Sequence, residues 1–247
     1  MVEPLSVLYE TATAYREWAP PPAWEHAVTC LWEHRVGPVV DLVHRVLPDR
    51  CGDVIVDQAG NGSVVGVHDQ PLLAALAPGT VLRGLRFRPE AVGRALGAEA
   101  ASLRNETLDL GAVVGPARAR ALTAALLDGA LDEVHQWLTE LRMDRRTTAA
   151  VHALATPSDV VAVADRVGLS TRQLRRLVLA DVGVGPKTLQ RVSRFWRFMA
   201  MAERPGSTDG LALLAGIAGY TDQAHLTKEV RELSGLPPAA LLSERSA

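Results

Sequence analysis

Three residues near the N-terminus have the spacing of a metal site on a helix. His26, Cys30 and His34 follow one another at intervals of four residues. The residues around Cys30 alternate as in a strand, however, where ligand geometry across four residues is strained. Cys30 and Cys51 are the only cysteines, which excludes a disulfide framework and a zinc site of four thiolates. We expect no metal site here, with metal or redox sensing as the alternative.

Signatures of catalysis are missing from the sequence. It has no glycine-rich phosphate loop, no nucleophile elbow and no His-Glu-x-x-His pattern. Asp49 and Asp53 flank Cys51, but acidic residues commonly occupy turns at strand ends. We therefore expect no catalytic residues and no cofactor.

Arginines form the strongest charge feature of the chain. The net charge of the 247 residues is −2, but residues 1–157 carry 14 Arg against 19 acidic residues. Residues 158–247 carry 12 basic against 9 acidic residues, and the segment 170–204 alone has a net charge of +6. Such a segment suits a partner rich in phosphates. The alternative is a basic helix face that only contacts solvent.

The composition is that of an ordinary globular protein, with 48% apolar and 22% charged residues. There is no apolar run of about 18 residues, and the start Met1-Val2-Glu3-Pro4 is acidic. We expect neither a membrane span nor export, and hence a cytoplasmic protein.

The sequence pattern differs between the two parts of the chain, one typical of strands and the other of helices. Short runs rich in Val and Leu around 28–34, 42–47, 54–56, 64–67 and 80–87 predict five strands in a small sheet or barrel. After Pro89 the pattern becomes helical, with helices expected at 91–96, 117–127 and 131–141. The predicted fold class is α+β, with an N-terminal domain 1–156 and an all-α domain 157–247 that begins at Pro157.

The second domain contains an internal repeat. Val160, Val163, Ala164, Val167 and Gly168 recur 51 residues later as Leu211, Leu214, Ala215, Ala218 and Gly219. Both sets have the spacing of an amphipathic helix that a glycine ends. After the turn the offset becomes 52, so that Leu174 corresponds to Leu226 and Pro186 to Pro238. Ser170 and Thr221 are the N-cap candidates of the second helix in each copy.

Two helices joined by a short glycine turn form the helix-turn-helix pattern. Leu174 and Val178 are expected to be buried, while Arg172, Arg175 and Arg176 point outward. Residues 187–203 predict one uninterrupted helix between the copies, about 25 Å long. A helical module with a purely structural role is the alternative.

Residues 158–247 resemble the tandem helix-turn-helix domain of the AraC/XylS transcriptional regulators. The resemblance rests on residues 160–170, on the Gly185-Pro186 exit with its long helix, and on Ile217-Ala218-Gly219-Tyr220-Thr221-Asp222-Gln223-Ala224-His225-Leu226. Val178 and Val230 depart from it, since the family usually has Phe at both positions. The resemblance implies a sequence-specific DNA-binding regulator that reads two successive major-groove segments.

The resemblance also implies which residues meet DNA. Those facing bases would be Arg172, Gln173, Arg175 and Arg176 in the first unit, and Gln223, Ala224, His225, Thr227 and Lys228 in the second. We assign phosphate contacts to Ser170, Thr171, Lys187, Arg191, Arg194 and Thr221. Residues 211–247 have a net charge of −1, so we expect the first unit to supply most of the salt-dependent affinity.

The N-terminal domain resembles the small cupin-like sensor or dimerisation modules that precede this DNA-binding domain in relatives. Trp18, Trp24 and Trp32 are candidate walls of a ligand pocket, although such residues are more often core. The expected partners are double-stranded DNA, a small-molecule effector, a second copy of the chain and, for an activator, RNA polymerase. The alternative function is an enzymatic or sensing N-terminal domain fused to a DNA-targeting module.

Overall fold

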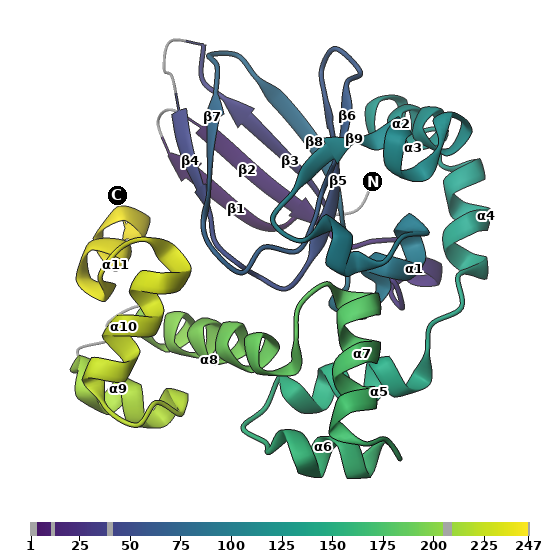
Figure 1. Cartoon of the computed structure of the whole chain (residues 1–247). Coiled ribbons are helices and arrows are strands. Elements are labelled where there is room, and N and C mark those ends of the chain that lie inside the picture. Colours follow the sequence, from purple (N-terminus) through teal and green to yellow (C-terminus); the bar gives the residue numbers. More distant parts are fainter. Residues whose placement is uncertain (1–3, 11–12, 39–41, 205–208, 247) are drawn as a thin grey trace.

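The computed structural model describes residues 4–10, 13–38, 42–204 and 209–246, and it has the predicted α+β architecture. Figure 1 shows the strands above, helices α1 to α4 beside them, and α5 to α11 below. The larger sheet has antiparallel pairs in the spatial order β1 (Pro4–Glu10), β2 (Thr13–Trp18), β3 (Val28–Val36), β8 (Val81–Phe87), β5 (Gly52–Asp57), β6 (Gly62–Val65), β9 (Thr107–Asp109). Strands β4 (Leu42–Val46) and β7 (Leu72–Leu76) pair as a second sheet.

The two faces of the larger sheet differ in chemistry. Because side chains alternate along a strand, Val54, Leu85 and Phe87 share one face, and all three are buried in the hydrophobic core. The helices on this side include α2 (Leu110–Val114), α3 (Pro116–Asp128) and α4 (Asp132–Glu140). The opposite face carries Asp53 and Arg86, which are cross-strand partners. The apolar face therefore supplies the core, and the polar face is left for other contacts.

Proline and glycine delimit the first helices. Pro89 opens a 3-10 turn (Pro89–Ala91) that leads into α1 (Val92–Leu96), and Gly97 ends α1 with φ +67°. Pro116 opens α3, and Gly129 ends it with φ +73°. A second 3-10 turn, η3 (Ala100–Leu103), follows α1, and a third, η1 (Pro22–Trp24), precedes β3.

The internal repeat is present as two similar helical units. The first contains α6 (Val160–Arg166) and α7 (Thr171–Val182), and the second contains α9 (Leu211–Ala218) and α10 (Gln223–Ser234). The helices α8 (Pro186–Ala202) and α11 (Pro238–Ser246) begin at the two repeated prolines. The long helix between the copies is confirmed as α8.

Helix α5 (Arg145–Leu154) joins the second half of the molecule. It precedes the predicted boundary at Pro157, yet it packs against α6, α7 and α8. Its residues Ala150 and Leu154 are fully buried. The division at Pro157 stays a prediction, and α5 adds a third helix to the first unit.

The structure contains strands that the sequence pattern does not indicate. Besides the five expected, the described residues form β1, β2, β7 and β9. The sequence of β7 is Leu-Leu-Ala-Ala-Leu, which favours a helix by intrinsic propensity. Its pairing with β4 overrides that preference. Within the described ranges no helix has the length and apolar character needed to cross a membrane, and Met1–Glu3 lie outside those ranges.

Substitution by alanine at Gly84 and at Gly216 should change the free energy of unfolding in opposite directions. A Cβ on Gly84 would lie 2.1 Å from the indole of Trp32, whereas a Cβ on Gly216 would meet nothing within 4 Å. We predict that Gly84→Ala lowers the free energy of unfolding by about 1–3 kcal/mol through overpacking. Gly216→Ala, inside α9, should raise it by about 0.5–1 kcal/mol. Urea unfolding measures both, and an unchanged Gly84→Ala midpoint would contradict the close contact.

Candidate nucleic-acid interface and buried polar cluster

The N-terminal half of α7 presents three arginines to solvent. Arg172, Arg175 and Arg176 are exposed, and none of them pairs with another described residue. Behind them, Leu174 and Val178 are fully buried. The helix is thus held firmly from one side while its guanidinium groups stay available on the other, as the sequence predicts.

A capping box fixes the start of α7. The Ser170 hydroxyl accepts a hydrogen bond from Gln173 N at 3.2 Å, and Gln173 Oε1 accepts one from Ser170 N at 2.9 Å. The expected N-cap Ser170 is confirmed. The amide oxygen of Gln173 is turned back to the cap, which leaves its amino group for other partners. Thr171 is exposed at the first helical position.

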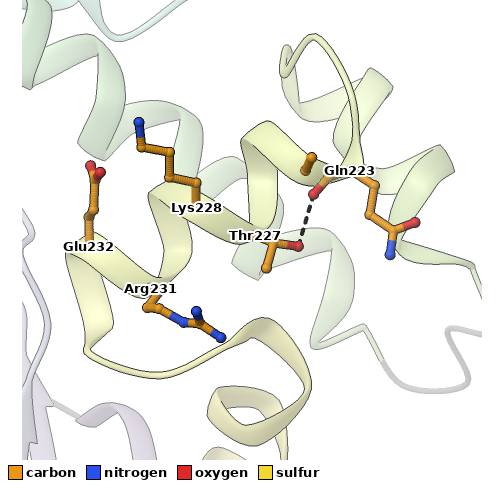
Figure 2. A pocket seen from close by; sticks show the side chains of 6 residues that line it. Gln223, Thr227, Lys228, Arg231 and Glu232 are labelled. Atoms are coloured by element: carbon orange, nitrogen blue, oxygen red, sulfur yellow. Dashed lines mark hydrogen bonds between the residues drawn. The ribbon is translucent and has the colours of Figure 1, made fainter.

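The matching face of α10 forms a shallow groove (Figure 2). Gln223, Ala224, Thr227, Lys228, Arg231 and Glu232 line it. Four of these are predicted base-facing residues, so the structure brings them together. Arg231 was not predicted, although its position four residues after Thr227 places it on the same helix face. Thr227 Oγ1 donates to Gln223 O within the helix at 2.9 Å.

The cap of α10 differs from the prediction. Asp222 is the N-cap, and its Oδ1 accepts a hydrogen bond from His225 N at 2.7 Å. Thr221, the expected cap, lies one residue earlier and is exposed. An ionised Asp is as good a cap as Thr and suits the positive end of the helix dipole. His225 is half-buried against the ring of Tyr220, with Nε2 3.4 Å from Glu229.

The arginines of α8 are engaged inside the protein. Arg194 pairs with the buried Glu229, its Nη2 lying 2.5 Å from Oε1, and Arg191 lies 3.4 Å from the same carboxyl group and pairs with Glu232 as well. These pairs join α8 to α10. Both arginines are predicted phosphate contacts, but their partners here give them a structural task. Lys187 remains exposed and unpaired among the described residues.

Arg197 connects the two units directly. Its Nη1 donates to Ala218 O at 2.7 Å and its Nη2 to Ala155 O at 3.1 Å. These carbonyl groups lie at the C-terminal ends of α9 and α5, where a cation interacts favourably with the helix dipole. One guanidinium group thus holds the first unit and the second unit at a fixed relation.

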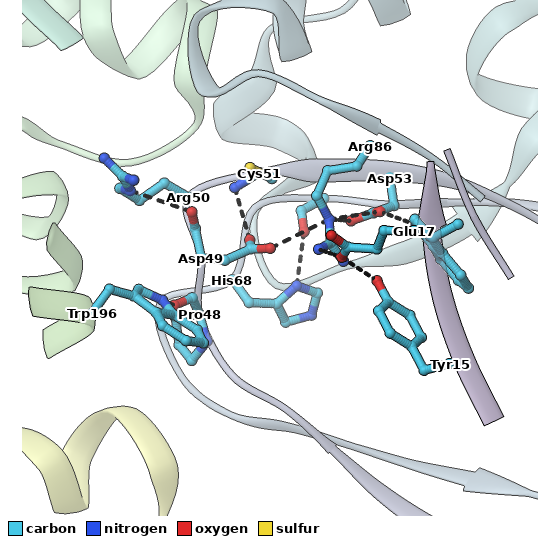
Figure 3. Close-up of polar contacts among 12 residues, drawn as sticks. Tyr15, Glu17, Pro48, Asp49, Arg50, Cys51, Asp53, His68, Arg86 and Trp196 are labelled. Carbon is cyan, nitrogen blue, oxygen red and sulfur yellow. Dashed lines mark hydrogen bonds and ion pairs between the residues drawn. The ribbon is translucent and has the colours of Figure 1, made fainter. Parts of the chain in front are cut away.

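A cluster of charged and aromatic side chains occupies the polar face of the sheet (Figure 3). Arg86 is its centre, with Nε 3.1 Å from Asp53 and 3.4 Å from Asp49, and Nη1 3.5 Å from Glu17. Trp32 Nε1 donates to Asp53 at 2.7 Å, and Tyr15 OH donates to Glu17 at 2.7 Å. One cation therefore contacts three carboxyl groups.

Burial changes the acidity of groups in and near this cluster. It raises the pKa of Asp53 to about 6, against the opposing charge of Arg86. It also raises the pKa of the Cys30 thiol to about 12 and that of the Cys51 thiol well above its usual value. Both thiols are free and would be protonated at neutral pH, a state in which a cysteine is a poor nucleophile.

The three predicted pocket tryptophans do not meet. Trp32 belongs to the polar cluster, whereas Trp18 is opposite Leu31 in the β2–β3 pair and points to the other face. Trp24 is fully buried, and its Nε1 donates to His135 Nδ1 at 3.1 Å. Strand alternation thus separates Trp18 from Trp32, and Trp24 lies in the core, so the structure does not bring the three side chains together; their role as walls of a ligand pocket stays a prediction.

The four-residue spacing of His26, Cys30 and His34 does not bring the three side chains together. Cys30 and His34 share a face of β3, but His26 precedes that strand and its Nε2 lies 3.1 Å from Leu141 O. In the part of the chain that the structure describes, no three His, Cys, Asp or Glu residues are grouped as metal ligands.

Two protein families match separate parts of the chain. Residues 163–244, which run from α6 into α11, match the family described as "Helix-turn-helix domain". Residues 16–109 match the family described as "Domain of unknown function (DUF6597)". A search of curated proteins gives no match to this sequence.

Among solved structures, the chain is similar to the ToxT protein of Vibrio cholerae. An apo variant from strain SCE256 shares 9% identity at a TM-score of 0.43, over 95% of this chain and 98% of that one. The wild-type protein of that strain is described as bound to an unsaturated fatty acid. It shares 11% identity at a TM-score of 0.40, over 82% of this chain and 90% of that one. ToxT of strain O395 shares 10% identity at a TM-score of 0.42, over 85% of this chain and 95% of that one.

The buried histidine of β3, His34, should make the stability of the protein depend on pH. His34 is buried, its Nε2 2.6 Å from Thr13 Oγ1 and its ring 4.9 Å from that of His44. Burial, aided by His44, lowers the pKa of His34 from 6.5 to about 4. The unfolded chain therefore takes up the proton first, and the free energy of unfolding falls as the pH drops from 6.5 towards 4.

We expect His34→Gln to remove this contribution. The glutamine can keep a hydrogen bond to Thr13 but carries no titratable group. Denaturant unfolding of both proteins at about pH 7 and about pH 5 measures the effect. The loss of stability between these pH values should be smaller in the variant; an equal loss would show that His34 does not titrate as the structure indicates.

Proposed function

We propose that the chain is an AraC-type helix-turn-helix regulator that binds DNA, and that α7 and α10 read two successive segments of the major groove; the match of residues 163–244 to a helix-turn-helix domain supports the first part. The observation that carries the proposal is the row of arginines Arg172, Arg175 and Arg176, which pair with none of the residues that the structure describes and lie on a helix held from behind. Arginine is the side chain best suited to guanine edges and to phosphates. A structural bundle would have no use for three such groups on one exposed face.

The length of α8 supports a two-segment reading. Its 17 residues span about 25 Å. Recognition helices one helical turn of DNA apart are separated by roughly 34 Å. Since each recognition helix extends beyond one end of α8, a single chain has the reach to place both on one face of a duplex (Figure 1).

We assign roles to the exposed residues accordingly. Arg172, Arg175, Arg176, Gln223, Ala224, Thr227 and Lys228 would face bases, with Ser170, Thr171, Lys187 and Thr221 at phosphates. The internal contacts of Gln173, Arg191, Arg194 and His225 favour a positioning role for these four. Arg231 joins the second groove as a further candidate.

The N-terminal domain is proposed to modulate DNA binding through a small ligand. The polar cluster around Arg86 supports this, because its partly buried carboxyl, guanidinium, phenol and indole groups could hydrogen-bond a polar molecule. On this proposal residues 1–156 sense and residues 157–247 bind DNA. Association of two chains and contact with RNA polymerase are extensions of the same proposal.

Selection of duplexes from a random pool tests the reading of DNA. We expect the wild-type chain to enrich two short motifs, about one helical turn apart from centre to centre. Arg172→Ala or Arg176→Ala should relax the preference at one base pair of the first motif, by roughly 1–3 kcal/mol. Enrichment of one motif alone would refute the two-segment reading, and no enrichment would refute sequence-specific binding.

The salt dependence of binding separates the two units. Arg172→Ala should reduce the slope of the logarithm of the binding constant against that of the salt concentration more than Lys228→Ala does, and both should change it by less than the about 0.9 that one lost phosphate contact is worth, because both residues are assigned to bases. The reason is that residues 211–247 carry a net charge of −1, whereas residues 170–204 carry +6. Arg120→Ala, an exposed arginine of α3, serves as the control and should leave the slope unchanged. Equal reductions from Arg172→Ala and Lys228→Ala would contradict the division.

A further inference from the structure

The two helix-turn-helix units are attached to different parts of the N-terminal half. In the first unit, the C-terminal half of α7 packs against α1 and its flanking 3-10 turns. The contact is close, since a Cβ on Gly93 would lie 2.6 Å from Ala180 O and one on Gly183 would lie 2.8 Å from Ala100 O. Arg94 Nε lies 3.4 Å from the buried Asp181 at the same contact.

The helix α8 and the second unit are attached through residues Leu47–Arg50, which connect β4 to β5. Leu47 is buried in the hydrophobic core that Phe195 and Phe198 of α8 share with α9 and α10. Trp196 Nε1 donates to Pro48 O at 2.7 Å, and Arg50 Nη1 lies 3.2 Å from Ser193 Oγ. We call Leu47–Arg50 the strap.

A neighbouring arginine reinforces this attachment. Arg45, at the end of β4, donates through Nη1 to Ser234 O at 2.8 Å, the last residue of α10. Its Nε lies 2.8 Å from the Glu244 carboxyl group of α11. The second unit is therefore fastened at α8, α10 and α11 to one edge of the N-terminal domain, while the first unit is fastened elsewhere.

The shape of the strap depends on the polar cluster. Asp49 Oδ1 accepts a hydrogen bond from Cys51 N at 2.9 Å, while Oδ2 lies 3.4 Å from Arg86 Nε (Figure 3). Arg50 has φ +73°, a conformation that a residue with a side chain adopts only when its surroundings impose it. The carboxyl group of Asp49 thus ties the strap to the sheet at the residue before this strained one.

We propose that the strap, held by the Asp49–Arg86 pair, positions α8 and thereby sets the separation of DNA half-sites that the two recognition helices accept. Asp49, Arg50 and Trp196 are positioning residues in this arrangement, because they act through α8. The proposal rests on the proposed function, since it requires two recognition helices on one duplex. It adds that the spacing is fixed by the N-terminal domain as well as by α8.

The coupling has a direction that follows from charge. Arg86 divides its hydrogen-bonding capacity among Asp49, Asp53 and Glu17. Any change that draws the guanidinium group towards Asp53 or Glu17 weakens its hold on Asp49 and releases the strap. The half-site spacing that the protein accepts is therefore linked to the polar cluster through the side chain of Arg86.

The test measures spacing tolerance in the full chain. The probes are the duplex enriched by the wild-type chain, the same duplex with one base pair added between the motifs, and a duplex with the first motif alone. We expect the added base pair to weaken wild-type binding roughly tenfold and to weaken Asp49→Asn binding less than about threefold. Asparagine keeps an oxygen for Cys51 N but loses the pairing charge with Arg86. Affinity for the single motif should stay at the wild-type value.

Two further variants serve as a second test of the strap and as a control. Trp196→Phe keeps the ring in the core but loses the hydrogen bond to Pro48, and it should relax the spacing in the same direction. Glu106→Gln changes an exposed carboxyl group of the same domain that pairs with no other described residue, and this variant should bind like the wild-type chain. If Asp49→Asn failed to bind the single motif, Trp196→Phe would decide the question: relaxed spacing would support the strap, and wild-type sensitivity to spacing would overturn it.

The outcomes separate this inference from the proposed function. A wild-type chain that ignores the added base pair would overturn the reading of two half-sites itself. A wild-type chain that is sensitive to it, together with variants that are equally sensitive, would overturn the strap alone.

Discussion

The arrangement of the two helix-turn-helix units depends on the burial of one face of α8. Leu189 belongs to the hydrophobic core that continues through α7 and α5 into the N-terminal domain, whereas Phe195, Phe198 and Met199 belong to the core of the second unit. Each such side chain stabilises the fold by about 1.5–3 kcal/mol when fully buried. Because the same helix contributes to both cores, neither unit can move without disturbing the packing of α8. The fixed arrangement of the two units follows from this shared helix.

Local periodicity is enough to predict the helical half. The repeat, the glycine stops and the two prolines at helix starts are all visible in the sequence, because they depend on residues a few positions apart. Tertiary pairing is not visible in the same way. The strand β7 has a helical composition until β4 pairs with it, and Arg191 and Arg194 look like free charges until Glu229 lies beside them. That partner is far along the chain, and a count of charges cannot tell a paired arginine from a free one.

The interior of the N-terminal half shows the same limit. Strand alternation separates Trp18 from Trp32, but the sequence pattern does not predict the strand that contains Trp18, and the burial of Trp24 against α4 depends on distant residues. The gathering of Glu17, Asp49 and Asp53 around Arg86 joins three strands and a loop. Burial of so many charges is costly unless they are paired. The cluster therefore holds the sheet and the β4–β5 loop to one geometry.

The position of Arg197 bears on how this half of the molecule can be divided. The two units resemble each other in sequence, which suggests that either could be isolated as a small domain. Arg197 belongs to neither copy, yet it terminates a helix in both, at Ala155 and at Ala218. A fragment cut to contain one unit would lose one of these two hydrogen bonds and leave one helix end without its cation. The smallest piece that keeps both bonds therefore runs from α5 to α9, across both units.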